Sequence, residues 1–210
     1  HNPTSVVAQP DALRAIGELA LAAGAHVLVD EVYLDATARE TPTSLTLGDQ
    51  FIVTSSLTKS YGLAGLRCGW ILSSEAIAAQ LRRARDVVDG TGSIVAERLA
   101  VLAFAHLDRL HERARALLDV NMPLVHEFLR KRPELACPKP RGGTVVFPRL
   151  VNVEDTSTFA RRLLSERDTA IVPGHFFQSP GHFRLGFSGS TDQLRGGLER
   201  LADAIEGQCW

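Results

Sequence analysis

Apolar and polar residues follow two different periods along the first half of the chain, and these periods predict alternating helices and strands. Leu13, Ile16, Ala20 and Ala23 recur at helical spacing, between a proline that suits the first turn of a helix and a glycine that suits its end. The first part of 26–33 is a short apolar, β-branched run, which is typical of a strand buried in a parallel sheet.

Two more short apolar runs, at 51–54 and 69–72, predict further strands. Strands that alternate with helices are the order of an α/β fold. After a helix that follows the second of these runs, a long helical pattern extends from Ile94 to about Lys131. Pro123 lies within it and is expected to kink or restart the helix.

The second half of the chain predicts a separate, smaller unit. Residues 133–143 are rich in proline and glycine and are expected to form a connector. Beyond it we expect strands at 144–147, 170–172 and 183–187, a helix at 156–166, and a last helix that carries Leu194, Leu198, Leu201 and Ile205. The expected organisation is therefore a first part at 1–107, a connecting helix at 108–132, and a small α+β domain at 133–210.

The composition excludes several classes of protein. With 45% apolar and 22% charged residues among 210, the chain is that of an ordinary globular protein with a substantial core. A net charge of −1 gives no broad attraction to nucleic acid or to an anionic membrane, and neither a membrane span nor a signal peptide is recognised. Three widely spaced cysteines and scattered histidines predict neither disulfides nor a metal, and fit the cytoplasm. Because the chain begins with His1 rather than Met, we expect a fragment or a processed product.

The loop at 55–67 carries the strongest candidate chemistry. Lys59 lies between small hydroxyl residues after the run 51–54, and an amine partly desolvated there becomes a nucleophile toward carbonyls. Arg67 follows eight positions later, and arginine binds phosphate oxygens in a bidentate fork. This group suits pyridoxal 5'-phosphate held as a Schiff base, although a solvated loop lysine has the same local sequence. Asp30 ends another expected strand, at the edge where ligands bind in open α/β sheets.

The chain resembles the class I and II aminotransferases, which are fold type I enzymes that depend on pyridoxal phosphate. The resemblance rests on four segments in the family's order: Asn2-Pro3-Thr4, Asp30-Glu31-Val32-Tyr33, Ser56-Leu57-Thr58-Lys59 with Arg67, and Phe183-Arg184-Leu185-Gly186-Phe187. It covers the whole given chain, which looks like the family's later half. It implies an α/β fold with part of a three-layer, mostly parallel sheet in the cofactor-binding large domain, followed by a smaller α+β carboxy-terminal domain.

The resemblance assigns three catalytic residues. Lys59 forms the Schiff base and moves a proton between the substrate Cα and the cofactor, while Asp30 keeps the pyridine nitrogen protonated. Tyr33, together with Asn2, is expected to donate a hydrogen bond to the phenolic oxygen of the cofactor, which favours the anion of that oxygen. Glu31 is adjacent to Asp30 but is expected to point the other way.

The remaining expected contacts bind phosphate and substrate. By the resemblance, Ser56 and Arg67 are phosphate ligands. Arg184 lies inside an apolar strand, where an unpaired guanidinium is costly, so it needs an anionic partner. The resemblance implies that this partner is the substrate α-carboxylate, with Asn2 as a second contact, and an internal carboxylate is the alternative. Ser5 departs from the family, which usually has glycine after Asn-Pro-Thr.

The implied activity moves an amino group between an α-amino acid and a 2-keto acid, in a homodimer without nucleic-acid or membrane partners. Because the family's phosphate-binding turn and ring-stacking aromatic lie in its first half, weak or absent activity is expected for these 210 residues alone. Two alternatives stay open: another fold type I reaction, as in a decarboxylase, lyase or synthase, and the aminotransferase-like sensing domain of a transcription regulator.

Overall fold

The computed structural model describes residues 1–37, 41–139 and 142–207. The chain divides into two compact units. The first unit comprises Val7–Ala114, and the second unit comprises His1–Val6 together with the chain from Arg115 onward. The first six residues therefore fold with a part of the chain that lies more than a hundred positions away.

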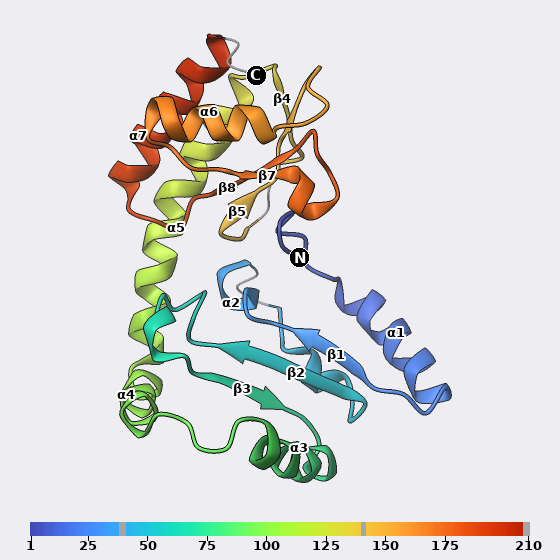
Figure 1. Ribbon diagram of the computed structural model, residues 1–210. Coiled ribbons are helices and arrows are strands. Elements are labelled where there is room, and N and C mark those ends of the chain that lie inside the picture. The colour runs from blue at the N-terminus through green and yellow to red at the C-terminus, as the bar shows by residue number, and fades with distance from the viewer. Residues whose placement is uncertain (38–40, 140–141, 208–210) are drawn as a thin grey trace. The chain divides into compact units, whose positions relative to one another are not determined.

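The first unit is built on a three-stranded sheet of order β1-β2-β3 (Figure 1), with β1 at Val27–Asp30, β2 at Phe51–Ser56 and β3 at Gly69–Leu72. The strands β1 and β2 are parallel, whereas β2 and β3 are antiparallel. The other elements are α1 (Pro10–Ala22), α2 (Leu34–Thr37), η1 (Ser44–Leu47), η2 (Ala64–Leu66), α3 (Glu75–Val88), α4 (Ile94–Phe104) and the start of α5 (Leu107–Arg130). The strands predicted in the first part of 26–33, at 51–54 and at 69–72 are confirmed.

Helix α1 reaches the sheet through a glycine. Gly17 is buried, and a Cβ atom at this position would lie 2.7 Å from Cζ of Phe51, closer than real carbon atoms approach. Only glycine therefore lets α1 approach the fully buried Phe51 ring at the start of β2. The predicted apolar face is confirmed only in part, because Ile16 is 47% exposed while Leu13 and Ala20 are half-buried.

A small apolar core lies beneath the loop that follows β2. Leu57, Tyr61 and Ala100 are its buried members, and partly buried side chains from the same loop, β3, α4 and α5 pack around them. Trp70 of β3 meets Phe104 of α4 edge to face, with ring centroids 5.2 Å apart. Such pairs add stability beyond the area that they bury, so α4 and β3 together hold this loop.

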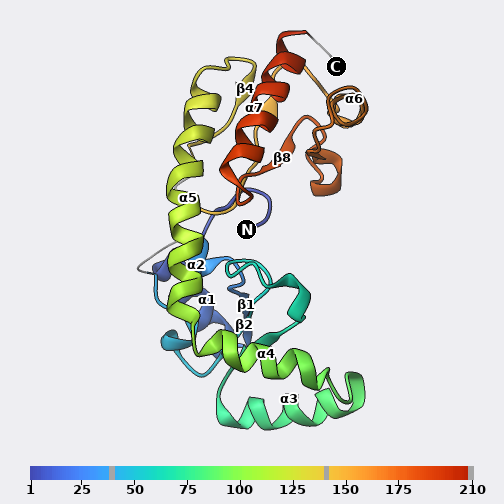
Figure 2. The ribbon, with the colours of Figure 1, turned by 90° about the vertical axis from the view of Figure 1, so that its left-hand side faces the viewer.

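Among the residues that the structure describes, the second unit combines two small antiparallel sheets with three helices, and the helices are labelled in Figure 2. One sheet pairs β4 (Leu135–Ala136) with β6 (Arg149–Leu150), and the other has the order β5-β8-β7, from Val145–Val146, Phe183–Gly186 and Val172–Pro173. The helices are the rest of α5, α6 (Ser157–Arg167) and α7 (Thr191–Glu206), and η3 (Gly174–Phe177) follows β7. The predicted last helix is confirmed as α7, and its Leu194, Leu198, Leu201 and Ile205 are all buried.

Two details of the sequence prediction differ from the structure. Pro123 does not restart the helix, because it lies inside α5, and the break in the helical pattern falls instead between Phe104 and Leu107. The strand expected at 170–172 is β7 at Val172–Pro173. Among the residues that the structure describes, none of the helices combines the length and apolar character needed to cross a membrane.

Asn121 joins α5 to the turn between β8 and α7. Its side chain is fully buried, and Nδ2 donates to the carbonyl oxygens of Phe187 and Gly189 at 2.8 and 2.9 Å. Its Oδ1 accepts from Oγ1 of Thr191 at 2.8 Å. A buried amide with its acceptor and both donors paired fixes the direction in which the chain leaves β8.

We expect Asn121→Ala to lower the free energy of unfolding by about 2–4 kcal/mol, because it leaves the buried carbonyl of Phe187, the part-buried carbonyl of Gly189 and the hydroxyl of Thr191 without this partner. Thr191→Val removes one of the three bonds and should cost about 1 kcal/mol. Urea denaturation followed by circular dichroism measures both. Equal losses for the two variants would contradict this account of Asn121.

Candidate active site

A pocket of about 420 Å³ opens at the carboxyl ends of β1 and β2 in the first unit. It is lined by Asp30, Val32, Thr54, Ser55, Ser56, Thr58, Lys59, Arg67, Cys68 and Gly69. The structure thus brings together an amine, a carboxylate, a guanidinium and several hydroxyl groups. The volume lies within the range of about 300–1,000 Å³ that is typical of small-molecule sites.

The pairing of the strands explains why these side chains meet. Because β1 and β2 are parallel and Asp30 is opposite Thr54, both strands end at the same edge of the sheet. The antiparallel strand β3 starts at that edge, with Gly69 opposite Ser56. A Cβ atom on Gly69 would lie 3.1 Å from the carbonyl oxygen of Ser55, so the glycine keeps β3, and with it Arg67, close to β2.

The loop at 57–67 is closed on itself by backbone hydrogen bonds. The amide of Leu57 donates to the carbonyl of Cys68 at 3.1 Å, and the amide of Leu63 donates to the carbonyl of Leu57 at 2.9 Å. Gly62 and Arg67 both adopt the left-handed conformation, with φ of 71° and 49°. This conformation suits glycine at position 62, and the turn at Arg67 brings the chain from η2 into β3.

The side chains of this loop alternate between the core and the pocket. Leu57, Ser60 and Tyr61 are buried, whereas Lys59 is exposed and lines the pocket. The backbone amide of Thr58 donates to Oγ of Ser56 at 3.3 Å, so Ser56 also stabilises the start of the loop. The loop is therefore anchored from below while its lysine faces the pocket.

Two adjacent carboxylates after β1 have different partners. Oδ1 of Asp30 accepts from the backbone amide of Val32 at 3.1 Å, which turns the chain after the strand and leaves the carboxylate in the pocket wall. Oε1 of Glu31 accepts from both the amide and the hydroxyl of Ser44 at 2.7 Å. Glu31 thus anchors η1 and lies outside the group of residues that line the pocket.

Tyr33 follows Asp30 in the same unit but does not line the pocket. Its carbonyl oxygen accepts from the amide of Ala36 at 3.1 Å and from Oγ1 of Thr37 at 2.9 Å. These bonds form the single turn of α2 directly after the tyrosine. The position of the phenol consequently depends on what holds this short turn in place.

Sequence reasoning missed a buried group that reaches this turn. Oη of Tyr61 donates to Oδ2 of Asp35 at 2.6 Å, and the Tyr61 ring meets His111 edge to face with centroids 6.2 Å apart. Nε2 of His111 lies 3.0 Å from the carbonyl oxygen of Asp35, which can only accept, so this nitrogen carries the proton. Burial, reinforced by the hydrogen bond to Asp35 and its charge, raises the pKa of the Tyr61 phenol above its ordinary value.

In the second unit, Asn2 and Arg184 are bonded to each other. Nη1 of Arg184 donates to Oδ1 of Asn2 at 2.9 Å, and its guanidinium carbon lies 5.2 Å from the centre of the Phe177 ring. Because a guanidinium only donates, the bond orients the amide and leaves Nδ2 of Asn2 available as a donor. Among the described residues, no carboxylate forms an ion pair with Arg184.

Ser5 adopts the conformation that glycine would take more readily. Its φ is 56°, and its amide donates to the carbonyl oxygen of His1 at 2.8 Å to close the turn that contains Asn2. Its Oγ donates to the carbonyl oxygen of Val145 in β5 at 2.7 Å. A side-chain hydrogen bond therefore offsets the cost of the left-handed backbone at the position where the family usually has glycine.

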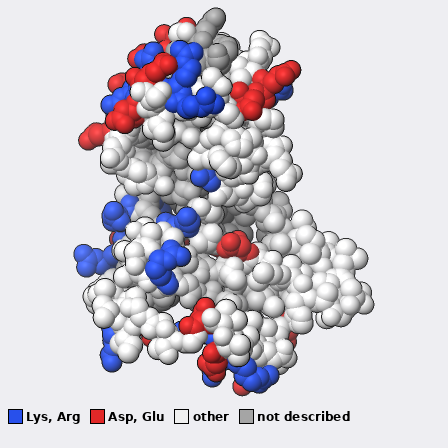
Figure 3. All heavy atoms as spheres, viewed as in Figure 1, with Lys and Arg blue, Asp and Glu red and all other residues white. Residues whose placement is uncertain are grey.

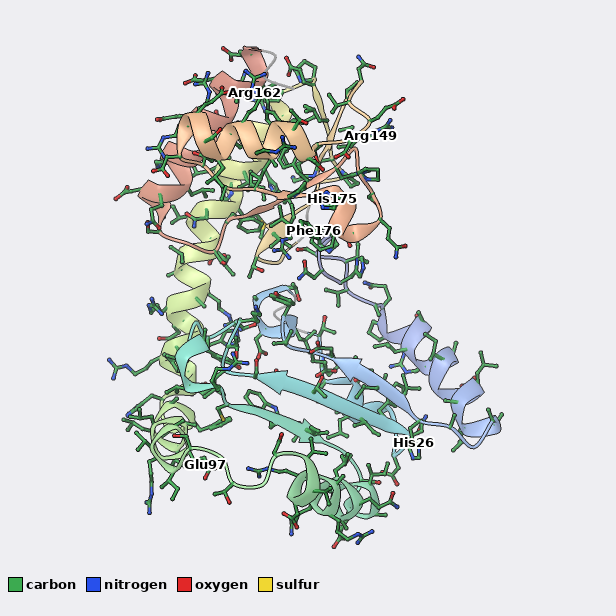
Figure 4. All side chains as sticks on the ribbon, in the orientation of Figure 1. His26, Glu97, Arg149, Arg162, His175 and Phe176 are labelled. Carbon is green, nitrogen blue, oxygen red and sulfur yellow. The ribbon has the colours of Figure 1, made fainter. Side chains whose placement is uncertain are left out.

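Two histidines near Arg184 in the sequence stabilise their own surroundings. His182 stacks on Phe147 with ring centroids 4.8 Å apart, and burial together with the charge of Arg149 lowers its pKa. Figure 4 shows His175 beside Phe176 on η3, and Nδ1 of His175 lies 2.8 Å from Oγ of Ser157 at the start of α6. Both histidines therefore contribute to the packing of the second unit.

On the face seen in Figure 3, acidic and basic side chains are interspersed over the helices of the second unit. Within the described part of the chain, no three His, Cys, Asp or Glu side chains gather as they would around a metal ion.

Comparison with known proteins gives the family. A family model described as "Aminotransferase class I and II" matches residues 1–201. Capreomycidine synthase of Streptomyces vinaceus is 30% identical over 208 residues, which cover 98% of this chain and 54% of that protein. Aspartate aminotransferase of Bacillus subtilis is 27% identical over 217 residues, covering 98% and 55%. The chain belongs to the class I and II aminotransferase family.

The solved structures agree with this family and with the predicted fold. A PLP-dependent aminotransferase from Streptococcus suis matches with a TM-score of 0.93 and 30% identity, over 98% of this chain and 55% of that one. The prediction of an α/β chain that carries part of a fold type I sheet is thereby confirmed. The chain spans about half the length of the curated relatives that it matches.

Variants of Ser5 distinguish the free-energy cost of its left-handed backbone from the stabilisation by its side-chain hydrogen bond. We expect Ser5→Ala to lower the free energy of unfolding by about 1 kcal/mol, because it loses the bond to Val145 and keeps φ positive. Ser5→Gly should stay within about 0.5 kcal/mol of the parent, because relief of the backbone compensates for the lost bond. Urea denaturation compares the three proteins, and an alanine variant as stable as the parent would contradict this balance.

Proposed function

We propose that this chain is the lysine-bearing part of an aminotransferase that moves an amino group between an α-amino acid and a 2-keto acid. The observation that carries the proposal is the grouping of Lys59, Asp30, Ser56 and Arg67 around one pocket at the carboxyl edge of the sheet. Several relatives that bear the name of an aminotransferase, among them the aspartate aminotransferase of Bacillus subtilis, support the same activity. Because the chain spans about half of these relatives, the proposal concerns the complete protein to which it belongs.

The residues of the pocket fit pyridoxal 5'-phosphate. Arg67 and the hydroxyls of Ser55, Ser56 and Thr58 provide a cation and donors for a dianionic phosphate. Asp30 provides a carboxylate for a protonated ring nitrogen, and Lys59 provides an amine for an aldehyde. When bound, this cofactor withdraws electrons from the substrate Cα, which makes the Cα proton removable.

Within this proposal each residue has one task. Lys59 would move a proton between the substrate Cα and the cofactor, because its amine lines the pocket. Asp30 would keep the ring nitrogen protonated. Ser56 and Arg67 would bind the phosphate, and Tyr33 and Asn2 would donate to the phenolic oxygen.

Arg184 is the proposed anchor for the α-carboxylate of the substrate. Its bond to Asn2 and the Phe177 ring against its face restrict the guanidinium while leaving further donors free. A bidentate bond from arginine to carboxylate gives both affinity and orientation. Among the described residues that line the pocket, Lys59 and Arg67 are the basic ones. We therefore propose no binding site for a carboxylate on the side chain of the substrate.

The proposal extends to organisation and location. We assign 1–107 to the cofactor-binding domain, 108–132 to a connecting helix and 133–210 to the small domain. A homodimer is supported by exposed apolar side chains on α4, such as Val101 at 68% and Leu102 at 56%. A cytoplasmic location is supported by Cys68 and Cys137, which are free thiols.

A second candidate function is favoured by one relative. Capreomycidine synthase carries a name that does not denote a transaminase, yet it is 30% identical to this chain. The same cofactor site would then serve a synthase reaction, because the bond that is cleaved depends on how the substrate is oriented.

The first test asks whether Lys59 is the reactive amine. The sequence contains three lysines, at positions 59, 131 and 139, so borohydride treatment in the presence of pyridoxal phosphate followed by peptide mapping distinguishes them. We expect the label on Lys59 and its loss in Lys59→Ala, in protein expressed from the complete coding sequence. Lys131→Ala is the matched control, because Nζ of Lys131 forms an ion pair with Oε1 of Glu127 at 2.7 Å. A label on Lys131 or Lys139 would refute the proposal.

The second test separates the transaminase from the synthase. A transaminase that receives an amino acid without any keto-acid acceptor should release one equivalent of keto acid per site and then stop. A synthase should instead release no keto acid under these conditions. The keto acid released is measured by chromatography across a panel of amino donors. Its amount is compared with the number of sites, which is taken from the borohydride labelling of Lys59 in a separate sample.

A further inference from the structure

Two loops that carry candidate site residues are bonded to each other in the first unit. Oγ of Ser60 donates to the carbonyl oxygen of Val32 at 2.9 Å, and Oη of Tyr61 donates to Oδ2 of Asp35 at 2.6 Å. Both donors directly follow Lys59 in the chain. Both acceptors belong to the segment 32–37, which contains Tyr33.

The Tyr61 side of this connection is rigid. Tyr61 is 5% exposed and belongs to the apolar core with Leu57 and Ala100. His111 of α5 closes the opposite side, since its ring meets Tyr61 and its Nε2 bonds the carbonyl oxygen of Asp35. The carboxylate of Asp35 is therefore held from a fixed part of the core.

The segment 32–37 has little support of its own. It consists of a turn and the four-residue helix α2, in which no residue is buried. Its backbone bonds are short-range, from the amide of Leu34 to Glu31 and from the amide of Ala36 to Tyr33. A single helical turn of this length is unstable by itself, so its geometry depends on contacts with the rest of the unit.

We propose that Tyr61 and Asp35 are a positioning pair, which fixes the segment that carries Tyr33 relative to the loop that carries Lys59. The proposal rests on the proposed function for its consequence, which is the placement of the Tyr33 phenol as a donor to the cofactor. Neither residue lines the pocket, so the pair acts through Tyr33 and Lys59 rather than on the substrate. Ser60 and His111 support the pair from the two sides.

The pair has a physical consequence that a generic core contact lacks. A hydrogen bond to a carboxylate is stronger than one between neutral groups, and here it joins elements that are 26 positions apart. Removing only the hydroxyl oxygen leaves the ring in the core. The core then keeps its packing, while segment 32–37 loses its strongest connection.

The first readout needs no cofactor. In Tyr61→Phe, we expect amide hydrogen exchange at Leu34 and Ala36 to accelerate about 10- to 100-fold, as loss of one charge-assisted bond implies. Amides of β2 should keep their exchange rates. Asp35→Ala should reproduce the effect, Asp35→Asn should restore most of the protection because it retains an acceptor oxygen, and the double variant Tyr61→Phe with Asp35→Ala should be no worse than Asp35→Ala alone.

The second readout uses the protein loaded with pyridoxal phosphate. A donor to the phenolic oxygen lowers the pH midpoint of the visible absorption band of the lysine-bound cofactor, so Tyr61→Phe should raise this midpoint in the same direction as Tyr33→Phe. Thr46→Val is the matched control, because it removes a hydroxyl of the same unit whose bond stays within 43–46. It should change neither readout.

The outcomes distinguish the two proposals. If Lys59 is not labelled by borohydride, the proposed function fails, and the exchange experiment still tests the pair. If Lys59 is labelled but Tyr61→Phe leaves both the exchange at Leu34 and Ala36 and the pH midpoint unchanged, the positioning pair is overturned. Faster exchange spread evenly over the whole first unit, without recovery in Asp35→Asn, would also overturn it, because that result is a general loss of stability.

Discussion

The candidate site depends on the parallel, in-register pairing of β1 with β2. Four consecutive residue pairs, from Val27 with Phe51 to Asp30 with Thr54, bring the two strands to an end at the same edge of the sheet. The carboxylate of Asp30 leaves one strand there, and the loop of Lys59 leaves the other. A shift of one residue in this register would turn Asp30 to the opposite face of the sheet, away from the pocket. The burial of Phe51 beneath Gly17 of α1 therefore supports the site as well as the fold.

In the lysine loop, the side chains that stabilise the fold are different from the one that faces the pocket. A fully buried ammonium is costly, whereas a fully solvated flexible lysine is poorly oriented for reaction. The structure avoids both, because Leu57 and Tyr61 anchor the loop in the core while Lys59 remains exposed in the pocket wall. The Lys59 amine is thus oriented by neighbours that do not line the pocket. One of them, Tyr61, also bonds Asp35 in the segment that contains Tyr33.

The sequence predicted much of this arrangement because the relevant signals are local. The strands β1, β2 and β3 are short apolar runs, and the lysine loop follows directly from one of them, so their order along the chain implied a shared edge. The contacts that it missed are non-local. Nothing in the pattern around Tyr61 indicates a bond to Asp35, and nothing in the helical spacing of α5 indicates that Asn121 is its buried centre, because each depends on a partner from another element. Pro123 does not restart the helix, since α5 continues through it from Leu107 to Arg130.

The surroundings of Arg184 bear on the anionic partner that the sequence predicts for it. The substrate α-carboxylate is the expected partner of this guanidinium, and an internal carboxylate is the alternative. The structure supplies the neutral oxygen of Asn2 and the face of Phe177 instead. These partners orient the cation without neutralising it, which leaves its charge available to an anion. An internal carboxylate would have compensated the charge and removed that capacity, so a neutral partner is what an anion-binding arginine requires. Ser5 contributes to this arrangement from the other end of the chain, because its bond to Val145 ties the turn that presents Asn2 to the sheet that presents Arg184.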